Sequence, residues 1–116
     1  MSKPLGPYTP AVRAGDFIFV SGQLGMADGQ LASGVAAQTA QAVANLAGQL
    51  EGLGASLDDV VKTTCFLVDM DAFATFNEAY IGGFGSHRPA RSTIAVRELP
   101  ANGLVEIEAV AHRPNG

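Results

Sequence analysis

The chain has 116 residues, 47% of them hydrophobic, which is enough for one compact domain with a core that needs no metal or disulfide. Its net charge of -4 and seven scattered lysine and arginine residues disfavour nucleic acid and anionic membranes as partners. A single cysteine excludes an internal disulfide. Without a signal-peptide core or a run of roughly 18 apolar residues, we expect a cytoplasmic protein with no membrane span.

The first clear element is a strand predicted over residues 16–21. Its two phenylalanines point to one side and Ile18 and Val20 to the other, so both of its faces are apolar. A strand predicted over residues 60–68 has the same property. One layer of helices covers only one side of such a sheet. The other side therefore predicts a second protein surface, and hence an oligomer.

Two amphipathic helices are predicted between the strands. Residues 35–53 place apolar side chains at alternating three- and four-residue spacing and end at glycines. A second helix is expected from about residue 71 to residue 81, where three aromatic side chains share one stripe. Ser56 and Asp59 have the spacing of a capping box just before the strand at residue 60. Both helices are expected to pack on the sheet.

The last third of the chain has the pattern of a β-hairpin. Strands are predicted over about residues 91–98 and 104–111, with a turn over residues 99–103. Asn102 and Gly103 would supply the positive-φ positions that such turns favour. The resulting order of strands and helices predicts an α+β fold with two helices on one face of a mixed sheet.

The sequence indicates a single domain over residues 1–116, since it has no repeat, linker or low-complexity tract. It contains no phosphate-binding loop, nucleophile elbow or dinucleotide glycine motif. The two histidines, His87 and His112, lie far apart and lack the spacing of metal ligands. Neither a metal nor a nucleotide cofactor is therefore expected.

Charged residues inside the predicted strands are few and informative. Arg91 opens a strand after Pro89, and its planar guanidinium is suited to bind a carboxylate through two hydrogen bonds. The alternative is a strand-end arginine paired with an acidic residue. Glu106 and Glu108 project from the same side of the last strand, which indicates either acid–base chemistry or a solvated face. Spacing alone leaves both questions open.

Several short motifs occur in a fixed order along the chain. They are GPYTPAV at 6–12, VSGQL at 20–24, VVKTTCFLVDMDAF at 60–73, FNEAY at 76–80, RPARSTIAV at 88–96 and VEIEAVA at 105–111. With this combination the chain resembles the Rid/YjgF family of imine and enamine deaminases over about residues 5–111. The resemblance implies a chorismate-mutase-like α+β fold that assembles as a homotrimer, with ligand sites in the clefts between subunits.

The resemblance also implies an activity and a set of site residues. Deaminases of this family detoxify reactive 2-imino acids, such as 2-iminobutanoate and 2-iminopropanoate, by hydrolysing them to 2-oxo acids and ammonia without a cofactor. Arg91 matches the residue that binds the substrate carboxylate, and Glu106 matches the residue associated with the attacking water. The expected pocket residues are Tyr8, Ser21, Gly22, Asn77, Phe84 and Thr93. Thr93 stands where the best-known members have cysteine, which puts the substrate range in doubt.

The predicted hairpin adds a constraint on this site. It would place Arg91 opposite about Ala111, some five residues from Glu106, or roughly 16 Å at 3.3 Å per residue. One chain could not then bring both side chains around one small molecule. We therefore expect a site that pairs Arg91 of one subunit with Glu106 of its neighbour.

Three alternatives stay open on the sequence alone. The first is a trimer that binds small carboxylates without turnover. The second is a deaminase for another enamine, such as aminomuconate. The third is the ribonuclease or translation-inhibitor role associated with some relatives, which the acidic net charge and the missing basic groove disfavour.

Overall fold

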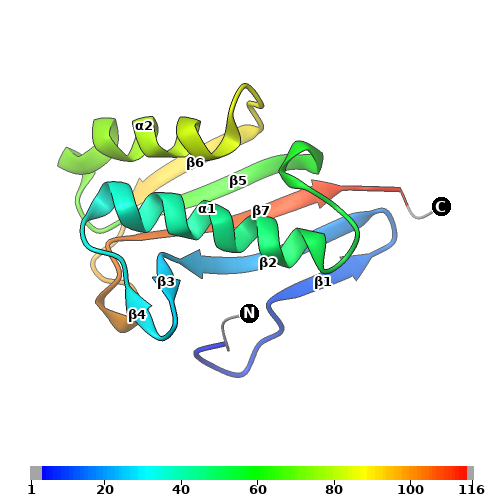
Figure 1. Cartoon of the computed structure of the whole chain (residues 1–116), viewed down its shortest axis with the longest axis horizontal. Helices are drawn as coiled ribbons and strands as arrows, with labels where there is room; N and C mark the ends of the chain where they lie inside the picture. The colour runs from blue at the N-terminus through cyan, green and yellow to red at the C-terminus, as the bar shows by residue number, and fades with distance from the viewer. Residues whose placement is uncertain (1–3, 115–116) are drawn as a thin grey trace.

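The computed structural model describes residues 4–114, which form a main sheet backed by helices and a small separate ribbon. The sheet has five strands in the spatial order β1-β2-β7-β5-β6 (Figure 1). Their bounds are Ala11–Ala14 (β1), Phe17–Leu24 (β2), Val60–Leu67 (β5), Ala90–Ala95 (β6) and Val105–His112 (β7). A separate ribbon consists of β3 (Met26–Ala27) and β4 (Gln30–Leu31).

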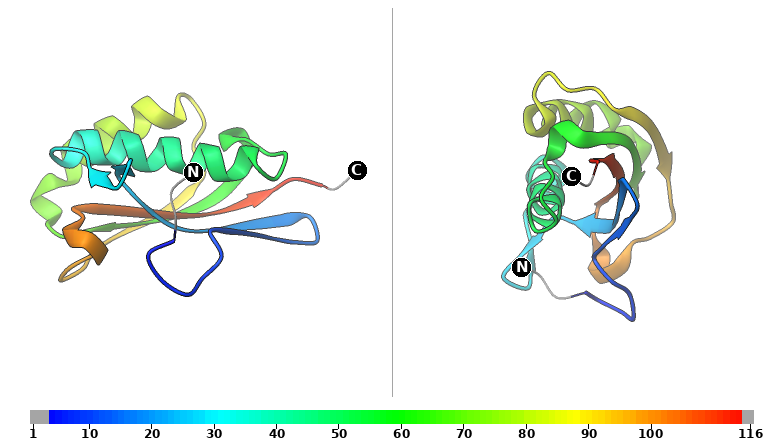
Figure 2. Two further views of the ribbon diagram at one scale, coloured as in Figure 1. Left: turned by 60° about the horizontal axis from the view of Figure 1, so that its bottom comes forward. Right: turned by 90° about the vertical axis from the view of Figure 1, so that its right-hand side faces the viewer.

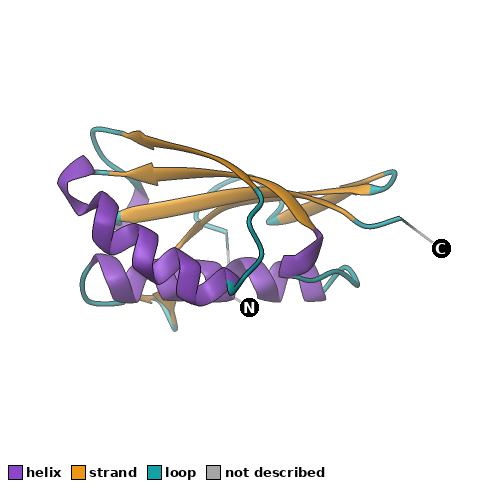
Figure 3. Cartoon of the chain, turned by 90° about the horizontal axis from the view of Figure 1, so that it is seen from above, coloured by secondary structure: helices purple, strands orange, loops and turns teal. Residues whose placement is uncertain are grey.

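Both helices, α1 (Val35–Glu51) and α2 (Phe73–Phe84), lie on the same face of the sheet (Figures 2 and 3). The predicted α+β class with two helices on one face is therefore confirmed. Short 3-10 turns at Leu57–Asp59, Met70–Ala72 and Pro100–Asn102 connect the elements. None of the helices within residues 4–114 is long and apolar enough to cross a lipid bilayer.

The helices form where the apolar periodicity predicts them. α1 buries Val43, Leu46 and Leu50 against the sheet, at three- and four-residue spacing. α2 buries aromatic side chains on one stripe, but it begins two residues later than predicted because a 3-10 turn precedes it. The predicted cap before β5 is confirmed, since the Ser56 N–H donates to the Asp59 carboxylate at 2.9 Å.

The predicted C-terminal hairpin is wrong. β6 does not pair with β7 but lies parallel to β5, with Arg91 beside Thr63. β7 pairs with the other side of β5, where Ala109 lies beside Thr63. The connection from β6 to β7 thus passes the end of β5. Its positive-φ residues are Asn102, at 61°, and Ala101, at 58°, whereas Gly103 has a φ of -60°.

The face of the sheet away from the helices, here called the open face, carries exposed apolar side chains. In β2, Phe17 and Phe19 are 43% and 49% exposed, and they alternate with Ile18 and Val20, which the helices bury. Ile94 of β6 is 47% exposed. The predicted apolar character of both faces of β2 is confirmed. Apolar side chains gathered on an exposed face are typical of a surface that packs against another protein.

Candidate half-sites on opposite faces of the sheet

The predicted site residues divide into two groups that lie on opposite faces of the sheet. The arginine half-site, on the helix-bearing face, comprises Arg91 and Thr93 of β6 and Asn77 of α2. The glutamate half-site lies on the open face and at the adjacent sheet edge. It comprises Glu106 of β7, Ser21 and Gly22 of β2, and Tyr8 of the N-terminal segment.

In the arginine half-site, the guanidinium of Arg91 lies against aromatic rings. Its central carbon is 4.9 Å from the ring centroid of Tyr80 and 5.6 Å from those of Phe73 and Phe76. Within residues 4–114 no carboxylate forms an ion pair with Arg91. The alternative of a strand-end arginine paired with an acid is therefore not what this chain adopts. Its charge is available to an added carboxylate.

Two further polar atoms of this half-site lack partners. The side-chain oxygens of Asn77 and Thr93 are buried and accept or donate no hydrogen bond among the described residues. Buried polar atoms are usually hydrogen-bonded, so these two are suited to a ligand or a second chain. Cys65 lies across the strand pair from Thr93, but its thiol is directed at Thr63 Oγ1, 3.9 Å away.

Cys65 itself is not a candidate nucleophile. Burial raises the pKa of its thiol to about 11, and the hydrogen bond to Thr63 offsets only part of that effect. The thiol is therefore protonated at neutral pH, whereas the reactive form of cysteine is the thiolate.

Phe84, which the family resemblance places at the pocket, is 5% exposed in the single chain and packs in the core between α2 and the sheet. Its ring stacks on Tyr80 with centroids 4.6 Å apart. It therefore adjoins the arginine half-site through Tyr80. The rings that contact Arg91 were recognised in the sequence only as an apolar helix stripe.

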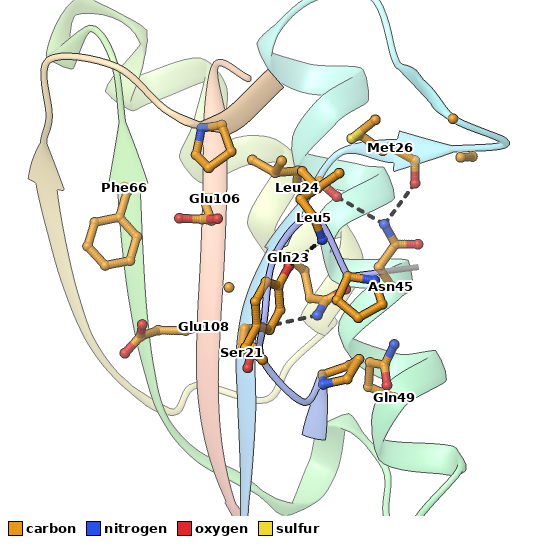
Figure 4. Close-up of a pocket in the computed structure, with 18 of the residues that line it drawn as sticks. Leu5, Ser21, Gln23, Leu24, Met26, Asn45, Gln49, Phe66, Glu106 and Glu108 are labelled. Atoms are coloured by element: carbon orange, nitrogen blue, oxygen red, sulfur yellow. Dashed lines mark hydrogen bonds between the residues drawn. The ribbon is translucent and has the colours of Figure 1, made fainter. Parts of the chain in front are cut away.

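The glutamate half-site borders an open pocket of about 920 Å³. The pocket lies between the N-terminal segment, β2, β7 and α1. Figure 4 shows Glu106 and Glu108 projecting from β7, with Phe66 on the β5 side and Ser21 on the β2 side. As predicted, both glutamates point away from the buried residues of β7. Glu106 is half-buried and Glu108 is exposed.

The N-terminal segment is attached to β2 beside this pocket. The Ser21 N–H donates to Pro10 O and its hydroxyl donates to Thr9 O, both at 2.8 Å. Tyr8, which is 45% exposed, accepts a hydrogen bond from the Leu5 N–H at 3.2 Å. Tyr8 and Ser21 therefore lie at the edge of the pocket that Glu106 also lines.

Gly22 lets the carboxyl group of Glu106 lie directly over β2. The pairing of β2 with β7 shifts register between Val20 and Gln23, so Gly22 sits in a bulge. A Cβ added at Gly22 would lie 2.7 Å from Glu106 Cδ, which is too close for a real contact. Because Gly22 does not have a positive φ, the missing side chain and not the backbone angle is what the site requires.

Gly22→Ala is therefore expected to displace the Glu106 carboxyl group. If Glu106 is the catalytic group that the family resemblance implies, kcat for imine hydrolysis should fall roughly tenfold to a hundredfold, the effect of about 1 Å of misplacement. The free energy of unfolding should change by less than about 1 kcal/mol, because a glutamate side chain moves easily. Steady-state kinetics measures kcat, and unfolding in denaturant measures the free energy of unfolding. If Glu106 transmits the effect, Gly22→Ala has no further effect on kcat in a Glu106→Gln background.

The surroundings of Glu106 favour its protonated form. Burial raises the pKa of its carboxyl group, and the negative charge of Glu108 raises it further. A carboxylate with a raised pKa is a stronger base, and such groups gather at functional sites. Glu106 thus has the electrostatic character of a general base.

Glu108→Gln tests this electrostatic coupling. A general base works as the carboxylate, so if Glu106 has the role that the resemblance implies, activity should fall as the pH drops through its raised pKa. Removing the like charge lowers that pKa, and the acidic limb of the kcat profile should therefore move to lower pH. Glu51→Gln, an equal change of charge at the exposed end of α1, should leave the limb in place. If the acidic limb of the kcat profile stays at the wild-type pH in Glu108→Gln as well as in Glu51→Gln, Glu108 does not raise the pKa of Glu106 and the coupling is contradicted.

Arg91 and Glu106 do not meet within one chain. Arg91 lies level with Ala109, three residues along β7 from Glu106, and β5 separates the two strands. Arg91 also faces α2 whereas Glu106 faces away from the helices. The two side chains are therefore separated within one chain, as the predicted hairpin also required, but the cause is the sheet order and the opposite facing of the two side chains.

The fold and its two half-sites define a small α+β protein with a separated cationic and acidic site. The family model described as Endoribonuclease L-PSP matches residues 1–113, and the chain belongs to this family, the Rid/YjgF family indicated by its motifs. The human 2-iminobutanoate/2-iminopropanoate deaminase is 44% identical over 110 residues, which cover 92% of this chain and 80% of that protein.

Solved structures of the family have the same fold. The YjgF gene product of E. coli has a TM-score of 0.91 and 39% identity, covering 95% of this chain and 91% of that chain. E. coli TdcF, solved with bound serine, has a TM-score of 0.91 and 35% identity, with the same coverage of 95% and 91%. The family predicted from the motifs is therefore confirmed.

Proposed function

We propose that this protein hydrolyses 2-imino acids, or their enamine tautomers, to 2-oxo acids and ammonia, without a metal or organic cofactor. The observation that carries the proposal is Arg91, a half-buried guanidinium that no acid within residues 4–114 neutralises. Such a group is suited to bind a small carboxylate. The deaminase names of the human and bovine relatives, both 44% identical, support the same reaction.

The proposed enzyme is a cytoplasmic homotrimer of chorismate-mutase-like architecture with its sites between subunits. Two observations support assembly. The open face exposes apolar side chains such as Phe19 and Ile94, and within one chain Arg91 and Glu106 lie on opposite faces of the sheet. In the trimer, the arginine half-site of one subunit faces the glutamate half-site of the next. Each cleft then has a cation for the carboxylate and a base for water.

Arg91 would bind the substrate carboxylate through two parallel hydrogen bonds and so fix the neighbouring imine carbon. Glu106 of the adjacent subunit would hold a water about 3 Å from that carbon and accept its proton. The water oxygen forms a bond to carbon as the imine π electrons move to nitrogen. The product of this step is a carbinolamine.

Breakdown of the carbinolamine completes the reaction. Glu106 returns the proton to nitrogen, and the C–N bond breaks as ammonia leaves. The hydroxyl oxygen forms the new carbonyl bond, and its proton passes to ammonia. The net change is addition of water and release of a 2-oxo acid and ammonium. Because protonated imines already react with water unaided, positioning and one base are sufficient.

A deamination assay tests the proposal. A dehydratase generates 2-iminobutanoate in place, and the release of 2-oxobutanoate is followed with wild-type protein, with Glu106→Gln and without protein. The proposal predicts faster release with the wild type only. Equal rates in all three would contradict it and would leave a carboxylate-binding protein without turnover. A panel containing aminomuconate-type enamines identifies the preferred substrate.

A further inference from the structure

We propose that Phe73, Phe76 and Tyr80 are positioning residues that hold the Arg91 guanidinium in place while leaving its charge for the ligand. These three rings are called the aromatic seat. The inference rests on the proposed function, since the seat acts through Arg91. It concerns how the carboxylate selectivity of the site arises, and not the deamination chemistry.

All three rings come from α2 and lie against the Arg91 guanidinium. Phe73, Phe76 and Tyr80 follow one another on α2 at three- and four-residue spacing, which places them on one helical face. All three ring centroids lie 4.9–5.6 Å from the central carbon of Arg91, within the range of cation–π attraction. The chain therefore brings three attractive contacts to one cation.

The inner part of the seat is rigid. Phe76 and Tyr80 are 0% and 3% exposed. The Tyr80 hydroxyl is hydrogen-bonded to Thr63 Oγ1 at 2.8 Å, and Thr63 is the direct neighbour of Arg91 in the parallel β5–β6 pair. The same hydrogen bond thus joins α2 to the sheet at the level of Arg91. Phe84 stacks on the Tyr80 ring and so also restricts its movement.

Aromatic rings are better suited to this task than an acidic residue. An aspartate or glutamate would also fix Arg91, but it would occupy the N–H donors and neutralise the charge. The rings attract the cation through their π faces and supply no carboxylate oxygen. A substrate carboxylate therefore meets no competing carboxylate on Arg91 within residues 4–114. The seat combines a fixed position with an unpaired charge.

The decisive test introduces a competing anion into the seat. Phe73 is 39% exposed, so polar substitutions there are compatible with folding. In Phe73→Glu the introduced carboxylate should pair with Arg91 and weaken the binding of 2-oxobutanoate, measured by calorimetry. The loss of affinity should be at least about tenfold larger than in Phe73→Gln, whose side chain has the size of glutamate but no charge. Lowering the pH protonates the introduced carboxyl group and should restore binding in Phe73→Glu alone. Lost packing would affect both variants equally at every pH.

A second pair of variants examines the inner ring. Tyr80→Phe keeps the ring and should retain most of the affinity, whereas Tyr80→Leu should raise KM at least about tenfold with a smaller effect on kcat. If Phe73→Glu and Phe73→Gln bind 2-oxobutanoate equally well at every pH, the proposed role of the aromatic seat is wrong, whether or not Tyr80→Leu folds.

That result would not affect the proposed function, provided that the wild type turns over 2-iminobutanoate. Absence of wild-type turnover rejects the function instead.

Discussion

Arg91→Ala should lower kcat/KM for 2-iminobutanoate by about a hundredfold or more. A partly buried charge pair with a carboxylate contributes about 3 kcal/mol, and each 1.4 kcal/mol corresponds to a factor of ten. The loss should appear mainly in KM and in the affinity for 2-oxobutanoate, because the carboxylate is present in substrate and product alike. Kinetics over a range of substrate concentrations separate the two constants.

The same substitution should leave the fold largely intact. Arg91 pairs with no acid within residues 4–114, so its removal leaves no buried carboxylate without a partner. Arg91→Lys is the matched control, since it keeps the charge but loses the planar fork, and it should have an intermediate affinity. Unchanged product affinity in Arg91→Ala would contradict the assignment of Arg91 to the carboxylate.

Glu106→Gln should lower kcat by about a hundredfold to ten-thousandfold, the usual contribution of a general base. Glutamine keeps the size of the side chain and its ability to bind water, but it accepts no proton. The affinity for 2-oxobutanoate should therefore change little. The two variants should therefore show opposite patterns. Arg91→Ala should lose substrate binding, and Glu106→Gln should lose the chemical step.

Stability provides the control for Glu106→Gln. Burial raises the pKa of Glu106 in the folded protein above its unfolded value. The protonated carboxyl group of Glu106 therefore contributes to the free energy of unfolding at a pH below its pKa in the unfolded chain. This contribution is lost as the pH rises through its pKa in the folded protein. Removing the charge should thus not lower the melting temperature at neutral pH. A variant with wild-type kcat would exclude Glu106 as the base.

The elements with local signals were predictable from the sequence. Both helices follow from apolar spacing, and the common facing of Glu106 and Glu108 follows from the two-residue period of a strand. The prediction of a C-terminal hairpin was wrong. It rested on an Asn-Gly pair between two apolar runs, which is a strong local signal for a hairpin. The parallel pairing of β6 with β5 is a long-range contact that no local pattern contains.

The site was predictable only in part. Spacing left Arg91 and Glu106 undecided, and the family resemblance assigned their roles. The aromatic seat was missed because α2 and β6 meet only once β6 lies beside β5. The stacking of Phe84 on Tyr80 in the core likewise depends on the folded helix and sheet. The requirement for Gly22 depends on a strand bulge, whose position the sequence pattern does not indicate.

The central claim is that each active site combines Arg91 of one subunit with Glu106 of another. The most direct measurement mixes inactive Arg91→Ala and Glu106→Gln proteins in equal amounts and follows 2-oxobutanoate release after subunit exchange, confirmed by native mass spectrometry. Random exchange in a cyclic trimer should restore about one quarter of the wild-type activity, since that fraction of the sites receives both intact side chains. Confirmed mixed trimers without restored activity would contradict the claim.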